Sequence, residues 1–204
     1  MPDSAEQSLR DRILDTAREL LIADGYRNLS MRKIARRIGV SATSIYLHFD
    51  HRDHLLHSLM EEAIDRLNGV LEAAARTSTD PVERLEKVAR AYIKFSLENP
   101  YQYQMIYVVR SEEMSRYPKE KFRRARRGYE LLEEIIREGV QQGMIEDDNP
   151  RIAAYSFWAQ LHGLMSVVHS KRLDTRIDRD IFLEKALHQV LKGLIPAEGL
   201  KKTI

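Results

Sequence analysis

The residues between Gly25 and Phe49 carry a cluster of positive charge that no nearby acid balances. Five cations lie in this stretch and no aspartate or glutamate does: Arg27, Arg32, Lys33, Arg36 and Arg37. A local excess of cations attracts the phosphate backbone of a nucleic acid. Five such charges are also typical of a solvated helix face, so the pattern of the surrounding residues has to distinguish the two interpretations.

That surrounding pattern predicts three helices separated by turns. Apolar residues recur three and four positions apart along Leu9–Leu21, and Gly25 can end this first helix. Ser30 can cap a second helix, because its hydroxyl can accept from backbone N–H groups that lack a partner there. Gly39 ends the second helix and Ser41 caps a third of about two turns. Two short helices joined by a glycine turn are typical of a helix-turn-helix.

The third helix, Ser41–His48, has two faces of different character. Ile45 and Phe49 are four residues apart and are expected to face inward. The opposite face carries Ala42, Thr43, Tyr46 and Leu47. Small residues at its front let a helix sit deep in a DNA major groove, where a methyl or hydroxyl group can meet a base edge. Tyr46 and His48 are long enough to reach sugar-phosphate oxygens, and Arg52 is near enough for a further phosphate contact.

Composition predicts an all-α fold of about nine helices. The chain has 204 residues, of which 43% are hydrophobic and 31% charged, with only nine glycines and six prolines. Helices are expected at about 52–76, 81–98, 101–109, 118–142, 150–172 and 178–195, after the three-helix head. We therefore predict a DNA-binding domain over residues 1–51 and a ligand-binding and dimerisation domain over 52–204, linked by the helix at 52–76.

Several classes of protein are disfavoured. Apolar runs are too short to cross a bilayer and no leader pattern opens the chain, so a cytoplasmic protein is expected. The absence of cysteine rules out disulfides and thiolate zinc sites. Neither Gly-x-Ser-x-Gly nor His-Glu-x-x-His occurs, and no phosphate-cradling glycine loop is found, so neither an enzyme nor a cofactor is predicted.

The head resembles the TetR family of bacterial regulators. The segments that carry the resemblance are Ile13–Ala17, Gly25-Tyr26, Ser30–Ala35, Gly39–Ser41 and Ile45–Phe49, followed by Arg52 and Leu55. Arg52 stands where the family usually has lysine, and Thr43 where a smaller residue is frequent. The resemblance implies phosphate contacts from Ser30, Arg32, Tyr46, His48 and Arg52, and base contacts from Ala42, Thr43 and Leu47. Together with Ser41 and Ser44, these residues make up the predicted DNA-binding set: Ser30, Arg32, Ser41, Ala42, Thr43, Ser44, Tyr46, Leu47, His48 and Arg52.

The expected function is that of a ligand-responsive transcriptional regulator. The prediction is a repressor that binds an inverted-repeat operator in double-stranded DNA as a dimer and is released by a small-molecule effector. The alternatives are an activator of the same fold and a protein that binds DNA without regard to sequence. The helices at about 150–172 and 178–195 are apolar on more than one side, which predicts a homodimer formed through them. In the family, the corresponding helices form a four-helix dimer interface.

Aromatic residues with polar tips are the candidates for an effector pocket. They are Tyr92, Phe95, Tyr103, Tyr107, Tyr129, Trp158 and His162. An apolar pocket with a few convergent hydrogen-bonding groups suits a small ligand, although the same residues could form an ordinary helical core. The run Trp158–Gly163 resembles the Trp/His-Gly motif of one TetR C-terminal subgroup.

Two further patterns left alternatives open. His51, His54 and His57 recur every three residues, but exposed or hydrogen-bonded histidines are favoured over a metal site, and no metal is predicted. The basic run Lys119–Arg127 is either a solvated face or a site for an acidic ligand, such as a coenzyme A thioester, or an additional DNA contact.

Overall fold

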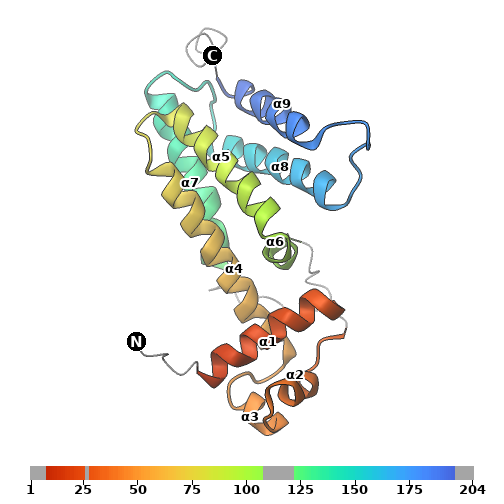
Figure 1. Ribbon diagram of the computed structural model, residues 1–204. Coiled ribbons are helices and arrows are strands. Elements are labelled where there is room, and N and C mark those ends of the chain that lie inside the picture. The colour runs from red at the N-terminus through yellow and green to blue at the C-terminus, as the bar shows by residue number, and fades with distance from the viewer. Residues whose placement is uncertain (1–7, 26–27, 108–121, 196–204) are drawn as a thin grey trace, which may run out of the picture. The chain divides into compact units, whose positions relative to one another are not determined.

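The computed structural model describes residues 8–25, 28–107 and 122–195, and within these ranges every regular element is a helix (Figure 1). The helices are α1 (Leu9–Asp24), α2 (Met31–Ile38), α3 (Ala42–Tyr46), α4 (Arg52–Ala75), α5 (Pro81–Glu98), α6 (Pro100–Tyr107), α7 (Phe122–Gln141), α8 (Pro150–His169) and α9 (Arg179–Lys192). The predicted all-α fold of about nine helices is confirmed. Arg27, Lys119 and Lys121 of the basic segments lie outside the described residues.

Local sequence signals set most helix starts. Ser30 accepts from the backbone N–H of Lys33 at 3.2 Å, and Ser41 accepts from that of Ser44 at 3.1 Å. Aspartate or asparagine caps α5, α8 and α9 in the same way, and proline takes the first helical position of α5 and α8. Gly39 ends α2 in the left-handed conformation, with φ of 75°.

Asp50 precedes α4, where an aspartate is expected to cap a helix, but the structure caps α4 differently. The backbone N–H of His54 donates to His51 Nδ1 at 3.0 Å, so the imidazole of His51 satisfies the helix start. The backbone N–H of Asp50 in turn donates to His54 Nδ1 at 3.3 Å. A neutral imidazole nitrogen accepts as a carboxylate does, which explains why the sequence signal for an Asx cap was misleading here.

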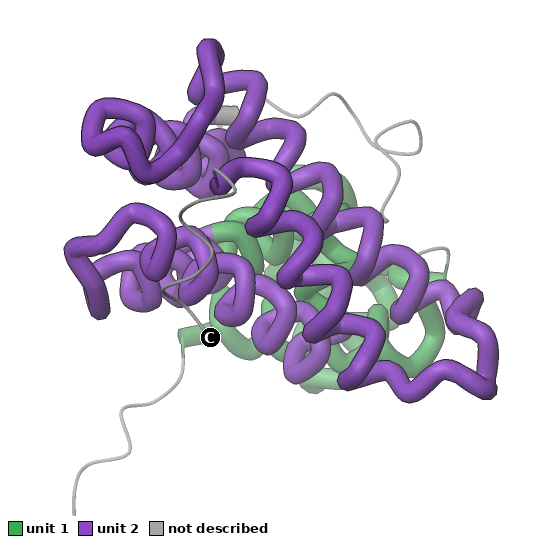
Figure 2. The backbone as a smooth tube through the Cα atoms, turned by 90° about the horizontal axis from the view of Figure 1, so that it is seen from above, with its two compact units in different colours: residues 1–64, 101–121 green, residues 65–100, 122–204 purple. Residues whose placement is uncertain are grey.

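The chain divides into two compact units, coloured separately in Figure 2. Unit 1 comprises residues 1–64 and 101–121, and unit 2 comprises residues 65–100 and 122–204. Unit 1 thus contains α1–α3, the first half of α4 and nearly all of α6. The predicted division at residue 51 is a division by function, and it stays a prediction.

The core of unit 1 holds α3 in place. Ile13 of α1, Ile34 of α2, Ile45 of α3 and Leu55 of α4 are fully buried in one apolar cluster. Met105 of α6 joins this cluster from a distant part of the sequence. Because every helix of the unit contributes to one close-packed core, the short α3 is held by its neighbours rather than by its own length.

The core of unit 2 is organised around α8. This helix packs on α7, α5 and α9 and buries Phe157, Leu161 and Met165. An ion pair of Arg84 with Glu138 joins α5 to α7. No helix among the described residues is long and apolar enough to cross a membrane.

Candidate DNA interface and effector site

The helix α3 is our candidate for the recognition helix, the one that enters the DNA groove, and it presents a small exposed face. Ile45 and Phe49 are fully buried, so their predicted inward orientation is confirmed. Tyr46 is 49% exposed and Leu47 is 81% exposed, and Thr43 and His48 are exposed as well. These exposed side chains together form a face of α3 that is accessible to a partner.

Two predicted DNA-binding residues of α3 also serve the fold. Ala42 is half-buried and packs against the core of unit 1, so it lies at the edge of the outward face rather than at its centre. Ser44 Oγ lies 2.8 Å from Ser41 Oγ, and Ser41 caps the helix. The most open part of the face is therefore formed by Thr43, Tyr46 and Leu47.

The cations of α2 fall into two groups. Lys33 pairs with Asp24 of α1, and Arg37 lies 3.9 Å from Glu19. Arg32 and Arg36 are exposed, and no described residue forms an ion pair with either. Ser30 is exposed while it caps α2, and Arg52 is half-buried, its Nε 3.8 Å from Asp53. Uncompensated guanidinium groups beside α3 provide the positive surface that phosphates require.

Five of the seven predicted effector residues lie in unit 2. Tyr92 and Phe95 of α5 are buried, and Tyr92 Oη lies 3.4 Å from His162 Nδ1. The rings of Trp158 and His162 are parallel, with centroids 5.0 Å apart, and Tyr129 meets the edge of Trp158 at 5.0 Å. Burial lowers the pKa of His162, which favours the neutral form of its ring.

Two residues near this cluster were not among the effector residues predicted from the sequence. Tyr155 stacks on Tyr129 with ring centroids 4.6 Å apart, and His169 Nε2 lies 2.8 Å from Ser96 Oγ. Burial also lowers the pKa of His169. Tyr155 precedes Trp158 by three residues, so their shared side of α8 was a signal that could have identified it.

The remaining two predicted effector residues lie in unit 1. Tyr103 is buried, and its ring centroid is 5.1 Å from that of Tyr107. Burial raises the pKa of Tyr103 to about 12, with a smaller contribution from Tyr107. The structure thus brings five predicted effector residues together in one unit and places this tyrosine pair in the other. Whether all seven contact an effector stays a prediction.

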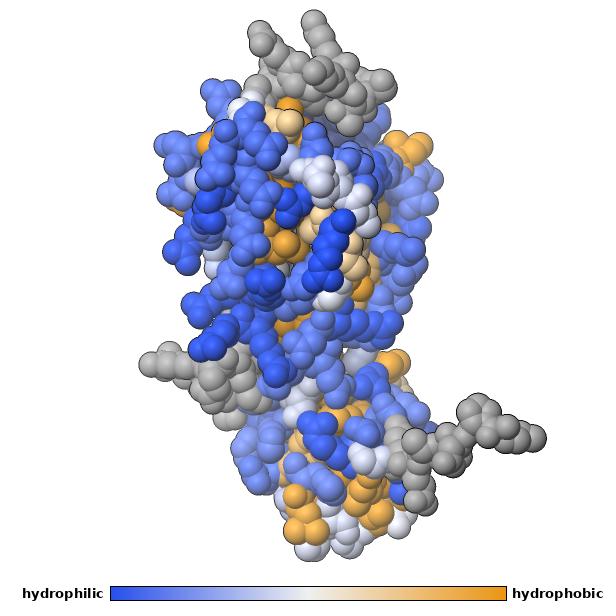
Figure 3. Space-filling model, turned by 90° about the vertical axis from the view of Figure 1, so that its left-hand side faces the viewer, coloured by the Kyte–Doolittle hydropathy of each residue, from blue (hydrophilic) through white to orange (hydrophobic). Residues whose placement is uncertain are grey.

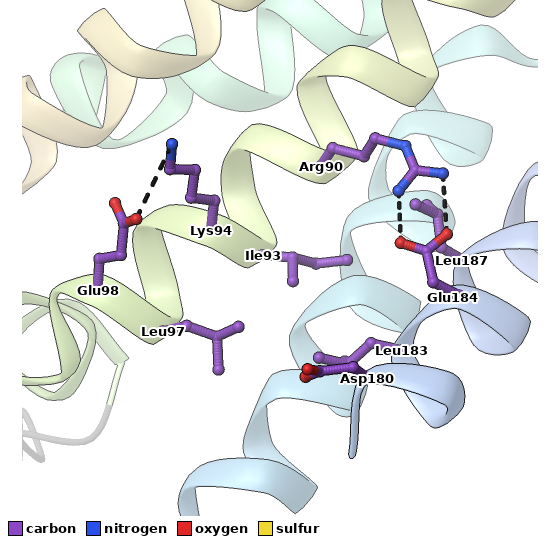
Figure 4. Close-up of a pocket in the computed structure, with 9 residues that line it drawn as sticks. All are labelled: Arg90, Ile93, Lys94, Leu97, Glu98, Asp180, Leu183, Glu184 and Leu187. Carbon is purple, nitrogen blue, oxygen red and sulfur yellow. Dashed lines mark hydrogen bonds and ion pairs between the residues drawn. The ribbon is translucent and has the colours of Figure 1, made fainter. Parts of the chain in front are cut away.

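A groove of about 260 Å³ lies elsewhere in unit 2, between α5 and α9 (Figure 4). Its floor is aliphatic, formed by Ile93, Leu97, Leu183 and Leu187. Arg90 crosses one end and donates to both carboxylate oxygens of Glu184, at 2.6 and 3.0 Å. This bidentate pair joins α5 to α9, and none of the predicted effector residues lines the groove.

The other charged patterns have local partners. On α7, Arg124 donates to Asp65 at 3.0 Å and Arg127 to Glu72 at 2.9 Å, so part of the basic run is tied to α4. Across the described ranges, no group of three or more histidine, aspartate or glutamate side chains could hold a metal ion.

Apolar side chains also reach the surface of α8 and α9. Ile152 is 63% exposed, Tyr155 44% and Ile181 59%. Figure 3 shows one face of the molecule, where apolar residues interrupt a largely hydrophilic surface. An added Cβ at Gly163 of α8 would meet nothing within 4 Å, so the backbone there is open to close approach.

Comparison with known proteins gives two family matches. Residues 13–59 match the bacterial regulatory proteins of the tetR family, and residues 85–190 match the tetracyclin repressor-like C-terminal domain. The HTH-type transcriptional repressor KstR2 of Mycolicibacterium smegmatis is 26% identical over 160 residues, covering 76% of this chain and 78% of that protein. The transcriptional activator FasR of the same organism is 31% identical over 98 residues, covering 48% of this chain and 45% of that protein.

A solved structure extends the match over nearly the whole chain. A protein of unknown function from Rhodococcus sp. RHA1 has a TM-score of 0.82 and 25% identity, and the match covers 96% of this chain and all of that one. Both family matches agree with the geometry, because one spans the helix-turn-helix and the other the helical body. The chain belongs to the TetR family and is a ligand-responsive, DNA-binding transcriptional regulator.

Proposed function

We propose that this protein represses transcription by binding an inverted-repeat operator as a homodimer, and that a small apolar effector releases it. The exposed face of α3 is the observation that carries the proposal. Tyr46 and Leu47 are open while Ile45 and Phe49 fix the helix from behind, and Arg32 and Arg36 lie on the adjacent helix with no ionic partner among the described residues. This is the combination of a shape-complementary helix and phosphate-binding cations that major-groove recognition requires.

A dimer suits a DNA-contacting helix as short as α3. The helix α3 spans only Ala42–Tyr46 and can contact few base pairs. Two such helices separated by one turn of DNA, roughly 34–36 Å, would read two half-sites and give the needed selectivity. The exposed apolar side chains of α8 and α9 support an interface through these two helices.

The aromatic cluster of α5, α7 and α8 is our candidate for the effector site. Its apolar rings and the polar pair of Tyr92 with His162 suit a mostly apolar ligand that carries one hydrogen-bonding group. The helix α4 runs without interruption from Arg52 to Ala75, so its residues belong to both units. An effector that favours a different position of α4 would lower operator affinity by a coupling of roughly 1–3 kcal/mol.

The relatives favour repression of transcription over activation. The match to the repressor KstR2 covers 76% of the chain, whereas the match to the activator FasR covers 48%. An activator is therefore the second candidate. We place the protein in the cytoplasm, where bacterial promoters lie, and assign it binding rather than catalysis.

Selection of bound duplexes from a random DNA pool tests this function. We expect the recovered sequences to converge on an inverted repeat, with binding at least about 1,000-fold tighter than to random DNA. The Thr43→Ala variant should select a different preferred base in each half-site while it keeps the symmetry of the repeat. Recovery of no common sequence, with affinity that depends only on salt, would instead show a protein that binds DNA without regard to sequence.

A further inference from the structure

Arg10 in the first turn of α1 stands apart from its charged neighbours. Ser8 Oγ donates to the Asp11 carboxylate at 2.6 Å, and Arg12 donates to the carbonyl of Ile38 at 3.0 Å. The Arg10 side chain is exposed, and no residue in the described part of the chain forms an ion pair or hydrogen bond with it. Its guanidinium carbon lies 5.4 Å from the ring centroid of Phe49, over the ring.

This contact places a cation at the end of the recognition helix. Phe49 follows His48 directly and is fully buried, so its ring is a fixed platform. The ring of His54 meets it in an edge-to-face arrangement, with centroids 5.5 Å apart. A guanidinium group over an aromatic face is attracted by the ring quadrupole, which favours this position for the otherwise mobile Arg10 side chain.

The contact with Phe49 leaves the hydrogen-bonding capacity of Arg10 available. A cation–π contact engages the positive charge of the guanidinium group and uses none of its five N–H donors. Asp11, the next residue in the chain, is already engaged, because its carboxylate accepts from Ser8. A positioned guanidinium without an acidic partner can bind an anion with two parallel hydrogen bonds.

We propose that Arg10 binds a phosphate of the DNA backbone, beside the wall of the major groove that α3 enters. The inference rests on the proposed function, because Tyr46 and His48 approach the backbone only if α3 lies in the groove. Phe49 directly follows His48 in the chain, and Arg10 is held over the ring of Phe49. Arg10 would therefore lie near the DNA phosphates that His48 approaches. The surface formed by Arg32 and Arg36 is thereby extended to α1.

The salt dependence of DNA binding tests this assignment. Each phosphate that a protein neutralises contributes about 0.9 to the slope of log affinity against log salt. In a dimer, Arg10→Ala should therefore lower that slope by about 1.8. Affinity at low salt should fall about tenfold, equally for the selected operator and for a random-sequence duplex of the same length. Arg10→Lys keeps the charge but loses the flat, two-pronged donor, so it should retain the slope and lose part of the affinity.

A matched control separates this contact from a general effect of charge. Arg76→Ala removes the same charge from the end of α4, where the side chain is 76% exposed. We expect Arg76→Ala to bind DNA as the wild type does. If Arg10→Ala has no more effect than Arg76→Ala, or if it changes the selected sequence, the phosphate contact is wrong. Thermal melting of both variants reports any loss of folding, and Arg10→Gln, which also removes the charge, gives the slope if Arg10→Ala unfolds.

The proposed function and this contact can fail separately. Wild-type protein that binds the random duplex but selects no operator would refute the repressor. The slope measured on the random duplex would still report the phosphate contact of Arg10.

Discussion

The face of α3 and the face of α8 both expose apolar side chains, but the two faces differ in the charges around them. Beside α3, Arg32 and Arg36 of α2 are exposed and lack ionic partners among the described residues. Along α8, no aspartate, glutamate, lysine or arginine occurs from Ile152 to Val168. An apolar surface with cations beside it suits DNA, whereas an apolar surface without charge suits another protein surface of the same kind.

Small residues add to the contrast. Ala159 and Gly163 of α8 are exposed between larger apolar residues, so a second helix can approach its backbone closely. At the end of α3, Leu47 is 81% exposed and presents a large side chain beside a short helix. The α8 face is therefore suited to close packing along its length, and the α3 face to insertion into a groove.

Ile152→Glu is expected to give the largest effect. A buried, unpaired carboxylate at the α8 face should weaken dimerisation by more than about 100-fold, because an uncompensated charge in an apolar interface costs several kcal/mol. Analytical ultracentrifugation over a range of concentrations measures the dissociation constant. Operator affinity should fall together with dimerisation, since the two half-sites would no longer be bound jointly.

A matched variant tests whether exposure alone explains this effect. Ile22 of α1 is 63% exposed, as Ile152 is, but it lies on another helix. We expect Ile22→Glu to leave the dimer intact. Equal dissociation in both variants, or in neither, would contradict the assignment of the α8 face to a second copy.

Tyr46→Phe should have a smaller effect, confined to DNA binding. The change removes a hydroxyl group that we expect to donate to a phosphate oxygen, which corresponds to a loss of up to about tenfold in affinity. The loss should be similar for every DNA sequence, because a phosphate contact carries no base information. Fluorescence anisotropy with operator and random duplexes provides the measurement.

Tyr155→Phe is the control for Tyr46→Phe. Tyr155 is 44% exposed and Tyr46 is 49% exposed, so both lose a hydroxyl group of similar accessibility. The Tyr155 variant keeps its apolar ring, so it should form the same dimer and bind DNA as the wild type does. A weaker complex in this variant, with its dimer intact in the ultracentrifuge, would show that the loss at Tyr46 does not report a contact in the groove.

Features that depend on neighbouring residues could be predicted from the sequence. The caps at Ser30 and Ser41 and the inward side chains of Ile45 and Phe49 depend on residues a few positions apart, and these predictions are confirmed. The start of α4 could not be predicted in this way, because the imidazole of His51 takes the capping role expected of the Asp50 carboxylate.

Contacts between distant residues could not be predicted. The position of Arg10 over Phe49, the hydrogen bond of Ser96 with His169, and the placement of Met105 in the core of unit 1 each join residues far apart in the chain. No local periodicity encodes such pairs. This is why the DNA face was predicted in greater detail than the effector site.

Acid should destabilise unit 2 through two half-buried histidines of α8. The pKa values of His162 and His169 lie below the ordinary value of 6.5 in the folded protein, because burial disfavours the charged ring. Below about pH 6.5 the unfolded chain takes up protons that the folded chain does not, so stability is complete above that pH and declines below it. Denaturant unfolding at pH 7.5 and 5.5 measures the decline.

Variants assign this decline to particular side chains. His162→Gln and His169→Asn should each reduce the difference in unfolding free energy between the two pH values. The exposed His188 of α9 is the control, and His188→Gln should leave the difference unchanged. An unchanged difference in the first two variants would show that other groups cause the loss in acid.

Tyr101→Phe is expected to have the smallest effect, and its sign distinguishes the tyrosines of the two units. The hydroxyl group of Tyr101 is buried without a hydrogen-bond partner among the described residues, and burial raises its pKa. Its removal relieves an unsatisfied polar group, so the free energy of unfolding should stay the same or rise by up to about 1 kcal/mol. In unit 2, Tyr92→Phe removes the hydroxyl that lies 3.4 Å from His162 Nδ1, and stability should fall by about 0.5–1.5 kcal/mol. Denaturant unfolding of both variants at pH 7.5 gives the two signs. A loss of stability in Tyr101→Phe would mean that its hydroxyl is satisfied in solution, which would remove this difference between the units.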